Sequence, residues 1–267
     1  MPFRTRPVPT INQGMECRPP NRGCRTKTNV PVTISRARSL SLTSDLITRA
    51  HPHKVEDDPS AIPLASEEEL SEALGAILTK SSTSNDLRVF AYGSLMWKPE
   101  FEFADHQIAT LRGWHRRFCL WQYRFRGTHD KPGVMLALDR GGSCVGIVYR
   151  ITGPDLEGKM MPVWRREMRG RGYKARWVSV ETAQGRCPAL TFVANRGGER
   201  YAGRLSDEEI ADRIAVACGH IGPSAEYLLN TVAHCEALGI HDRHLWRMQA
   251  LVAERLSIEE RCCPETA

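Results

Sequence analysis

The stretch VFAYGSLMWKP, residues 89–99, contains two short apolar runs separated by the tripeptide Tyr92, Gly93 and Ser94. The first run is typical of the end of a buried strand, which we expect over residues 88–92. A two-residue hairpin would favour Asn-Gly or Asp-Gly at the turn, and neither is present here. The strand therefore ends at a turn that needs another explanation.

Two explanations of this turn remain open at the level of the tripeptide. The last N–H groups of the strand have no strand partner and must be directed at another acceptor. Gly93 has no side chain, so a ligand or a second backbone segment can approach it closely. Successive backbone N–H groups in such a turn can bind an anion. The alternative is an ordinary tight turn with Tyr92 packed on the core.

The composition is that of a globular protein with a slight positive charge. The chain has 267 residues, 41% of them hydrophobic, and 37 Lys and Arg against 31 Asp and Glu, a net charge of +6. This charge suits an acidic small molecule as readily as a nucleic acid. The nine cysteines show no CxxC spacing, which argues against a zinc site. No signal peptide is recognisable, so we expect the protein in the reducing cytoplasm. We also expect no metal and no cofactor. No apolar run approaches the roughly 20 residues that span a bilayer, so we expect no membrane partner.

The composition of the chain changes near residue 60. Residues 1–38 are rich in Pro, Arg, Asn and Thr and lack hydrophobic periodicity. We expect a disordered basic tail with a short helix over 1–60, an N-terminal helix within 61–85, a domain over 86–256 and a C-terminal tail over 257–267. Two alternatives for the tail stay open: an organelle transit peptide, which the prolines disfavour, and a translation start at Met15 or beyond.

Strand patterns fill the first part of the domain and helical patterns flank them. Strands are predicted over 88–92, 115–125, 134–139, 143–152, 174–182 and 188–195. Helices are predicted over 41–51, 66–80, 207–220, 223–239 and 241–256, with capping boxes at Ser66/Glu69 and Ser206/Glu209. The inward faces should carry Leu70, Leu74, Ile77 and Leu78; Ile210 and Ile214; Leu228, Val232 and Cys235; and Leu245, Met248 and Val252. Strands followed by helices, without βαβ alternation, predict an α+β fold in which a small antiparallel or mixed β-barrel or sheet is flanked by helices.

Four separated motifs resemble the ChaC-type γ-glutamylcyclotransferases, which degrade glutathione. They are VFAYGSLMW, FCLWQYRFRGTHDKPGVMLALDRGGSCVGIVYRI, WRREMRGRGY and SAEYLLNTV, in the order of the family and over about residues 86–256. The resemblance implies a small β-barrel with attached helices, glutathione as substrate and Glu167 as the catalytic base. It assigns substrate binding to Val89, Phe90, Ala91, Tyr92, Gly93, Ser94, Leu95 and Tyr227. Two departures bear on substrate preference: His129 replaces the usual proline after RGT, and a basic RGRGY follows RREM.

The chemistry implied by this resemblance requires positioning and proton transfer. The α-amine of a γ-glutamyl group attacks its own γ-carbonyl, giving 5-oxoproline and a released amine. Because the substrate supplies the nucleophile, neither a Ser or Cys nucleophile nor a metal is needed, in agreement with the absence of GxSxG and HExxH motifs. One carboxylate of raised pKa can remove a proton from the ammonium and return one to the departing nitrogen. The N–H groups of residues 91–95 can bind the α-carboxylate or the developing oxyanion, so the substrate would complete the turn.

Several of these residues also have a purely structural interpretation. Glu167 stands among arginines, a pattern typical of a solvated ion pair that would lower its pKa. These arginines are Arg165, Arg166, Arg169 and Arg171. Tyr227 is compatible with a core position whose hydroxyl reaches the surface. His241 and His244 share a helical face, but no third metal ligand stands at a recognisable spacing, so we expect capping or surface roles.

Two alternative functions are compatible with the sequence. Residues 114–127, WHRRFCLWQYRFRG, interleave arginine with aromatic residues, as a groove for single-stranded nucleic acid would. We favour a half-buried strand pair with solvated arginines, because no RNP, KH or OB pattern accompanies the run, and so expect no nucleic-acid partner. The other alternative is cyclisation of different γ-glutamyl amino acids or γ-glutamylamines. Arg124, Arg126 and Lys131 are available for the second carboxylate of glutathione. The sequence does not indicate whether the protein is a monomer or an oligomer.

Overall fold

The computed structural model describes residues 39–53, 55–80 and 85–262. The tail predicted over residues 1–38 lies outside the described residues, as do residues 263–267. The described residues belong to one compact unit that begins at Ser39.

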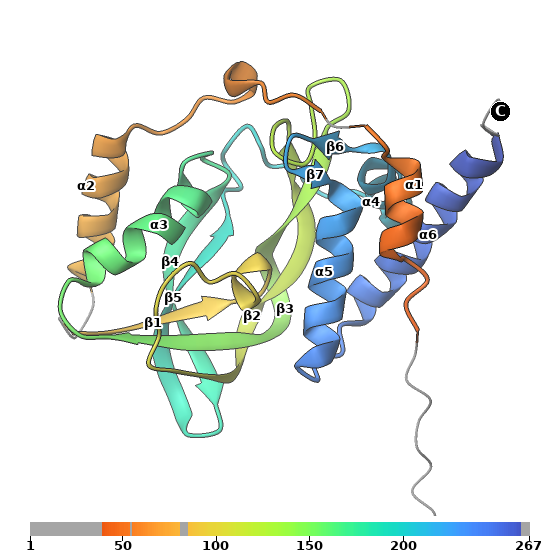
Figure 1. Cartoon of the computed structure of the whole chain (residues 1–267). Coiled ribbons are helices and arrows are strands. Elements are labelled where there is room, and N and C mark those ends of the chain that lie inside the picture. Colours follow the sequence, from red (N-terminus) through yellow and green to blue (C-terminus); the bar gives the residue numbers. More distant parts are fainter. Residues whose placement is uncertain (1–38, 54, 81–84, 263–267) are drawn as a thin grey trace, which may run out of the picture. The chain divides into compact units, whose positions relative to one another are not determined.

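A closed barrel of five strands forms the centre of this unit (Figure 1). The strands are β1 (Asp86–Ala91), β2 (Asp105–Gln122), β3 (Gly133–Thr152), β4 (Tyr173–Thr182) and β5 (Gly185–Ala194). Their order is β1-β3-β2-β4-β5; most neighbours are antiparallel, and a parallel contact between Val89 and Leu190 joins β1 to β5. The predicted α+β fold with a small barrel is therefore confirmed.

Two strands of the barrel are longer than predicted. β2 begins at Asp105 rather than at 115, and its first part alternates only weakly between buried and exposed side chains. β3 joins the segments predicted as separate strands over 134–139 and 143–152. Gly141 and Gly142, which favour a turn in the sequence, have positive φ angles of 103° and 65° but lie inside β3 at its exposed middle. Glycine accepts this backbone conformation without steric cost, so the strand can bend there instead of ending.

Helix α3 (Leu156–Met168) was not predicted: no element was expected between the strands predicted over 143–152 and 174–182. Pro162 lies inside this helix, where it removes one backbone hydrogen bond, and it obscures the helical pattern. Asp155 caps the helix by accepting a hydrogen bond from the N–H of Gly158. The buried face of α3 carries Leu156, Met160, Val163 and Trp164. This face fixes the helix against the barrel, and Glu167 lies in its last turn.

The remaining helices lie in two groups on either side of the barrel (Figure 1). One group contains α1 (Ser44–Ala50), α4 (Asp207–Val216), α5 (Ser224–Ala237) and α6 (Arg243–Cys262), and the other contains α3 with α2 (Glu67–Leu78). Short elements complete the unit: η1 (Pro59–Ala61), η2 (Ser94–Met96) and the hairpin of β6 (Cys218–Gly219) with β7 (Gly222–Pro223). Both predicted capping boxes are present.

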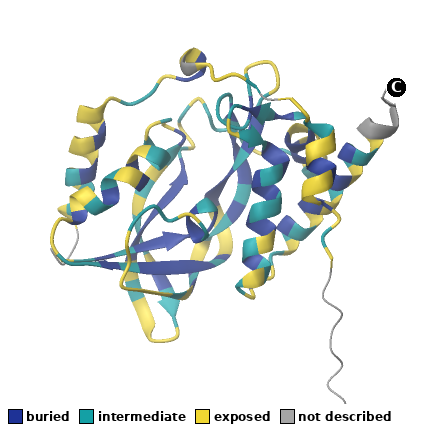
Figure 2. Cartoon of the chain, in the orientation of Figure 1, coloured by how far each residue is buried: buried dark blue, intermediate teal, exposed yellow. Residues whose placement is uncertain are grey.

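The helix faces pack as their sequence pattern predicts, and Figure 2 shows that the buried residues lie on the barrel and on the inner sides of the helices. The predicted inward residues of α4, α5 and α6 are buried, as are Leu70 and Leu74 of α2, whereas Ile77 and Leu78 are partly buried. The compact unit is longer than the predicted domain over 86–256, since it includes α1 and α2 and since α6 continues to Cys262. Among the described helices, none combines the length and hydropathy needed to cross a membrane.

Arg116 of β2 is a buried charge at the centre of this arrangement, with 6% of its surface exposed. Its Nε donates to the carbonyl of Tyr92 at 2.6 Å, its Nη2 donates to the carbonyl of Val145, and its Nη1 contacts Oδ2 of Asp242 at 3.3 Å. Arg116 thus connects the turn after β1, strand β3 and the start of α6. The interpretation of residues 114–127 as strands with solvated arginines is wrong at this position.

Replacement of Arg116 by Met is expected to lower the free energy of unfolding by about 3 kcal/mol or more, because it leaves buried carbonyls and a carboxylate without their partner. Urea denaturation measures this change. Arg112→Met is the matched control on the same strand: Arg112 is 69% exposed and pairs with Glu181, so its loss should cost about 1 kcal/mol or less. Equal effects of the two substitutions would contradict a structural role for Arg116.

Candidate active site

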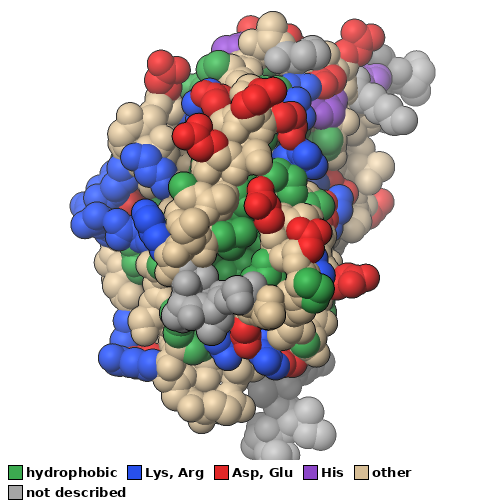
Figure 3. All heavy atoms as spheres, turned by 90° about the vertical axis from the view of Figure 1, so that its left-hand side faces the viewer, with side chains coloured by type: hydrophobic (Ala, Val, Ile, Leu, Met, Phe, Trp, Pro, Cys, Tyr) green, Lys and Arg blue, Asp and Glu red, His purple; other side chains and the backbone are tan. Residues whose placement is uncertain are grey.

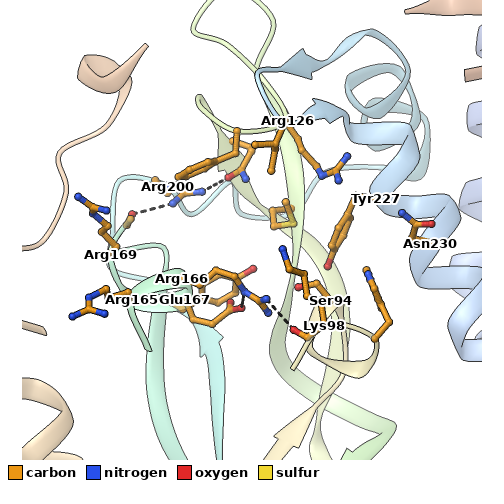
Figure 4. Close-up of a pocket in the computed structure, with 17 residues that line it drawn as sticks. Ser94, Lys98, Arg126, Arg165, Arg166, Glu167, Arg169, Arg200, Tyr227 and Asn230 are labelled. Carbon is orange, nitrogen blue, oxygen red and sulfur yellow. Dashed lines mark hydrogen bonds and ion pairs between the residues drawn. The ribbon is translucent and has the colours of Figure 1, made fainter. Parts of the chain in front are cut away.

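A cavity of about 460 Å³ lies between the barrel, α3 and α5 (Figure 4). Its wall is formed by Ser94, Trp97, Lys98, Gln122, Phe125, Arg126, Met135, Arg165, Arg166, Glu167, Arg169, Gly170, Tyr173, Arg200, Ile221, Tyr227 and Asn230. We call it the main cavity. A smaller recess of about 20 Å³ shares Ser94, Glu167, Tyr173 and Tyr227 with it and is completed by Tyr92, Gly93, Leu95, Leu136 and Phe192. We call it the inner recess.

The structure brings most of the predicted site residues together at the inner recess. Tyr92, Gly93, Ser94 and Leu95, which we call the YGSL turn, line it together with Glu167 and Tyr227. Val89, Phe90 and Ala91 line neither cavity, because their side chains are fully buried in the barrel core below the turn. The site therefore combines the end of β1, the last turn of α3 and the first turn of α5.

The YGSL turn is held from the side facing the barrel. Arg116 binds the carbonyl of Tyr92, the Tyr149 hydroxyl donates to the carbonyl of Met96 at 3.0 Å, and the N–H of Met96 donates to the carbonyl of Gly93 at 2.9 Å. Within the part of the chain that the structure describes, the N–H groups of Gly93, Ser94 and Leu95 have no hydrogen-bond partner. The turn therefore offers unused donors beside the inner recess, as an anion-binding turn requires.

Gly93 allows the hydroxyl of Tyr227 to reach the turn. A Cβ atom at position 93 would lie 2.9 Å from the hydroxyl oxygen of Tyr227, closer than normal packing permits. Tyr227 is 8% exposed, and its ring lies 6.1 Å from that of Trp97. Burial raises the pKa of Tyr227, and the nearby charge of Glu167 raises it further. The hydroxyl is therefore protonated at neutral pH and can donate a hydrogen bond.

Glu167 is a buried carboxylate with one cationic partner. Its side chain is 12% exposed, and the Nε of Arg166 donates to its Oε1 at 3.0 Å. Burial raises the pKa of Glu167, the charge and hydrogen bond of Arg166 oppose this shift, Glu100 adds to it, and the net direction is upward. Arg166 is shared, because its Nη1 also binds Glu100 Oε1 at 3.0 Å and the carbonyl of Lys98 at 2.9 Å. The ion pair predicted for Glu167 is present, but it does not lower the pKa below its ordinary value.

Two of the other arginines near Glu167 pair with helix α2, whereas Arg169 has no carboxylate partner among the described residues. Arg165 contacts Glu67 at 2.7 Å, and Arg171 contacts Glu69 at 2.7 Å. Figure 3 views the protein from the side of this helix and shows acidic and basic side chains together on its surface. The arginines of this basic segment thus have different partners, and among the described residues Arg166 is the one that bonds to Glu167.

Two further tyrosines, Tyr92 and Tyr173, line the inner recess together with Glu167. The hydroxyl of Tyr92 donates to the carbonyl of Phe192 at 2.8 Å, and that of Tyr173 donates to the carbonyl of Leu136 at 2.8 Å. Burial, followed by the charge of Glu167 among other groups, raises the pKa of Tyr173. The sequence analysis singled out RGRGY as a departure but did not assign Tyr173 to the site. Arg200 and Gln122 of the main cavity were missed too, because no local pattern marks them.

Of the basic residues that the sequence offered for substrate binding, only Arg126 lines the main cavity. Arg126 lines the main cavity and pairs with Glu226 at 2.7 Å. Arg124 pairs with Asp57 at 2.6 Å and, like Lys131, does not line the cavity. The ring of His129 contacts the carbonyl of Ala61 at 2.9 Å, away from the main cavity.

The prediction that His241 and His244 share a helical face is wrong, because α6 begins at Arg243 and only His244 lies in it. Both histidines have acidic neighbours. His241 contacts Glu236 at 3.2 Å, and His244 contacts Asp207 at 3.1 Å. Among the described residues, no group of three or more His, Cys, Asp or Glu side chains is arranged to hold a metal ion.

Comparison with known proteins places this chain in a defined family. A family model described as ChaC-like protein matches residues 87–255. The glutathione-specific γ-glutamylcyclotransferase of Escherichia coli (strain K12) is 36% identical over 180 residues, which cover 67% of this chain and 78% of that protein. Glutathione-specific γ-glutamylcyclotransferase 1 of Homo sapiens is 30% identical over 166 residues, which cover 60% and 75% respectively.

The fold agrees with that of a solved γ-glutamylcyclotransferase. A crystal structure of the enzyme specific to glutathione from yeast superposes with a TM-score of 0.59 and 20% identity, covering 64% of this chain and 96% of that chain. The barrel and its helices are thus those of a γ-glutamylcyclotransferase fold. The chain belongs to the ChaC-like family.

Replacement of Gly93 by Ala is expected to lower kcat/KM at least about tenfold for glutathione, the substrate that the sequence resemblance implies, because the new methyl group displaces the Tyr227 hydroxyl or the turn itself. Measurement of 5-oxoproline release checks this. Gly75→Ala in α2 is the control, since a Cβ atom there meets nothing within 4 Å. A folded Gly93→Ala protein with wild-type kcat/KM would show that the contact with Tyr227 does not matter.

Proposed function

We propose that this protein cyclises the γ-glutamyl group of glutathione and releases 5-oxoproline and Cys-Gly. The observation that carries the proposal is the inner recess, where Glu167, with a raised pKa, faces the open N–H groups of the YGSL turn. The substrate is supported by the related proteins named above, which are glutathione-specific. The cytoplasmic location expected from the cysteines stays a prediction.

The YGSL turn and Tyr227 position the γ-glutamyl group. The N–H groups of Gly93, Ser94 and Leu95 bind the α-carboxylate of the substrate, and this contact fixes the neighbouring α-amine. The Tyr227 hydroxyl donates to the γ-carbonyl oxygen and stabilises the negative charge that develops on it. Holding amine and carbonyl in contact replaces a search among many chain conformations, an effect worth several kcal/mol in favourable intramolecular reactions.

Glu167 transfers the proton between the two nitrogens. It accepts a proton from the α-ammonium group, whose freed lone pair attacks the γ-carbonyl carbon and forms the new C–N bond. The protonated Glu167 then donates this proton to the amide nitrogen of the cysteine residue, and the old C–N bond breaks as the tetrahedral intermediate collapses. The new ring nitrogen loses its second proton to the Glu167 carboxylate, which passes it to the released amine. The amine leaves as an ammonium group, and Glu167 ends the cycle as a carboxylate. The raised pKa makes Glu167 a better base toward the α-ammonium group than an ordinary carboxylate.

The nucleic-acid alternative is disfavoured by how the arginines of residues 114–127 are used. Arg116, Arg117, Arg124 and Arg126 all bind acidic side chains of the protein itself. A groove for single-stranded nucleic acid would instead present unpaired cations next to its aromatic rings.

Replacement of Glu167 by Gln is expected to lower kcat by about 10²- to 10⁴-fold without loss of folding, because the amide is isosteric but cannot accept the proton. Steady-state release of 5-oxoproline and a thermal melt measure the two properties. Glu157→Gln, an exposed residue of the same helix, should retain activity. If Glu167→Gln keeps more than about a tenth of the wild-type kcat, another group is the base.

The pH profile should reflect the raised pKa of Glu167. The carboxylate form is active, so activity falls as the pH drops through the pKa, and this fall should occur above the ordinary glutamate value of about 4.3. Glu100→Gln removes a negative charge that raises this pKa, so the acidic limb of kcat/KM should move to lower pH. An unmoved limb in Glu100→Gln would exclude Glu167 as the titrating group.

Reduced glutathione is expected to have a kcat/KM at least about tenfold above that of γ-glutamyl-alanine, which corresponds to roughly 1.4 kcal/mol of transition-state stabilisation. The reason is that the Cys-Gly part adds binding energy remote from the reacting atoms. Chromatography of 5-oxoproline and of the released amine from both substrates decides between glutathione and a broader range of γ-glutamyl compounds. Equal values would favour the broader range.

A further inference from the structure

Arg200 holds a fixed position in the wall of the main cavity. It follows β5, and its guanidinium bonds to three neutral acceptors from two other segments (Figure 4). Nε donates to the carbonyl of Trp121 at 2.9 Å, Nη1 donates to the carbonyl of Gly170 at 2.9 Å, and Nη2 donates to Oε1 of Gln122. The group is therefore oriented before any ligand binds.

The charge of Arg200 is not neutralised by the protein. Within the described ranges no carboxylate pairs with it, nor with Arg169 of the same wall, whereas three other arginines of the wall have acidic partners; these are Arg126, Arg165 and Arg166. Burial lowers the pKa of Arg200, which reflects its poor access to water. A guanidinium has five N–H groups, and the three bonds above leave two of them unused. Such a group favours a ligand that brings its own negative charge.

Two glycines make room for this guanidinium. A Cβ atom at Gly170 would lie 2.6 Å from Nη1 of Arg200, and one at Gly172 would lie 3.1 Å from the same atom. Both glycines belong to the segment RGRGY, residues 169–173. The absence of a side chain at these two positions leaves space for the Arg200 guanidinium at the cavity wall.

Arg200 lies apart from the reacting end of the site. In Figure 4 it is on the opposite side of the main cavity from Ser94 and Lys98. The inner recess, with Glu167 and the YGSL turn, does not include it. The main cavity also has apolar side chains in its wall, among them Phe125 and Met135. A substrate with its γ-glutamyl group in the recess can thus extend through the main cavity toward Arg200.

We propose that Arg200 is a specificity-determining residue that binds the carboxylate at the far end of the substrate, the glycine carboxylate of glutathione, through its two unused N–H groups. This inference rests on the proposed function. It replaces the candidates from the sequence: Arg124 and Lys131 do not line the cavity, and the charge of Arg126 is balanced by Glu226.

The test compares glutathione with its glycine monoethyl ester, which keeps the γ-glutamyl group and the thiol but lacks the terminal charge. The wild-type protein should have a kcat/KM at least about tenfold higher for the acid than for the ester. Arg200→Gln should bring the value for glutathione down to that for the ester while changing the ester value less than about threefold. Arg200→Lys, which keeps the charge but loses the planar fork, should retain part of the preference.

Matched variants separate a specific effect from a general one. Arg247→Gln removes the same charge at a site that is 60% exposed and paired with Asp207, and it should keep the wild-type ratio. Gly172→Ala leaves Arg200 in the chain but crowds Nη1, so it should reduce the ratio. If Arg200→Gln does not fold, the wild-type ratio and Gly172→Ala decide the matter.

Three results would overturn the proposal. They are equal wild-type values for acid and ester, an equal loss on both substrates in Arg200→Gln, and loss of the preference in Arg169→Gln instead. Failure of the proposed function gives a different result, since the wild-type protein would then release no 5-oxoproline from either compound.

Discussion

The buried guanidinium of Arg116 is the contact on which the rest of the site depends. It binds the carbonyls of Tyr92 and Val145 and the carboxylate of Asp242. Asp242 also accepts hydrogen bonds from the backbone N–H groups of His244 and Leu245 at the start of α6. Because the carbonyl of Tyr92 is held toward the barrel, the N–H groups that follow it remain available at the recess. Only arginine carries enough donors in one rigid plane for all these acceptors, so lysine would not replace it.

Burial raises the pKa of Glu167, and the charge and hydrogen bond of Arg166 oppose this shift. Glu67 and Glu69 of α2 bind Arg165 and Arg171, and Arg166 is shared with Glu100. Helix α2, which precedes the predicted domain, thus pairs with two arginines that lie close to Glu167 in the sequence, although it contributes nothing to the wall of either cavity.

The sequence predicted those parts of the structure that depend on local patterns. The capping boxes, the apolar helix faces and the end of β1 next to the YGSL turn are of this kind, and the four motifs located Glu167 and Tyr227. The sequence failed where distant contacts override local preference: Pro162 concealed α3, and paired glycines concealed the continuity of β3. The net pKa shift of Glu167 and the position of Arg200 depend on burial and on partners far apart in the chain, which no local pattern reports.

The closure of the barrel between β1 and β5 has a consequence for the kinetics of folding. The hydroxyl of Tyr92 donates to the carbonyl of Phe192, and that of Thr191 donates to the carbonyl of Phe90, so these bonds span 100 and 101 residues. Contacts of such long range require a large loss of chain entropy before they form, and they arise late in folding. Since the YGSL turn follows β1 directly, enzymatic activity should return during refolding only when β1 has paired with β5, after the helices have formed.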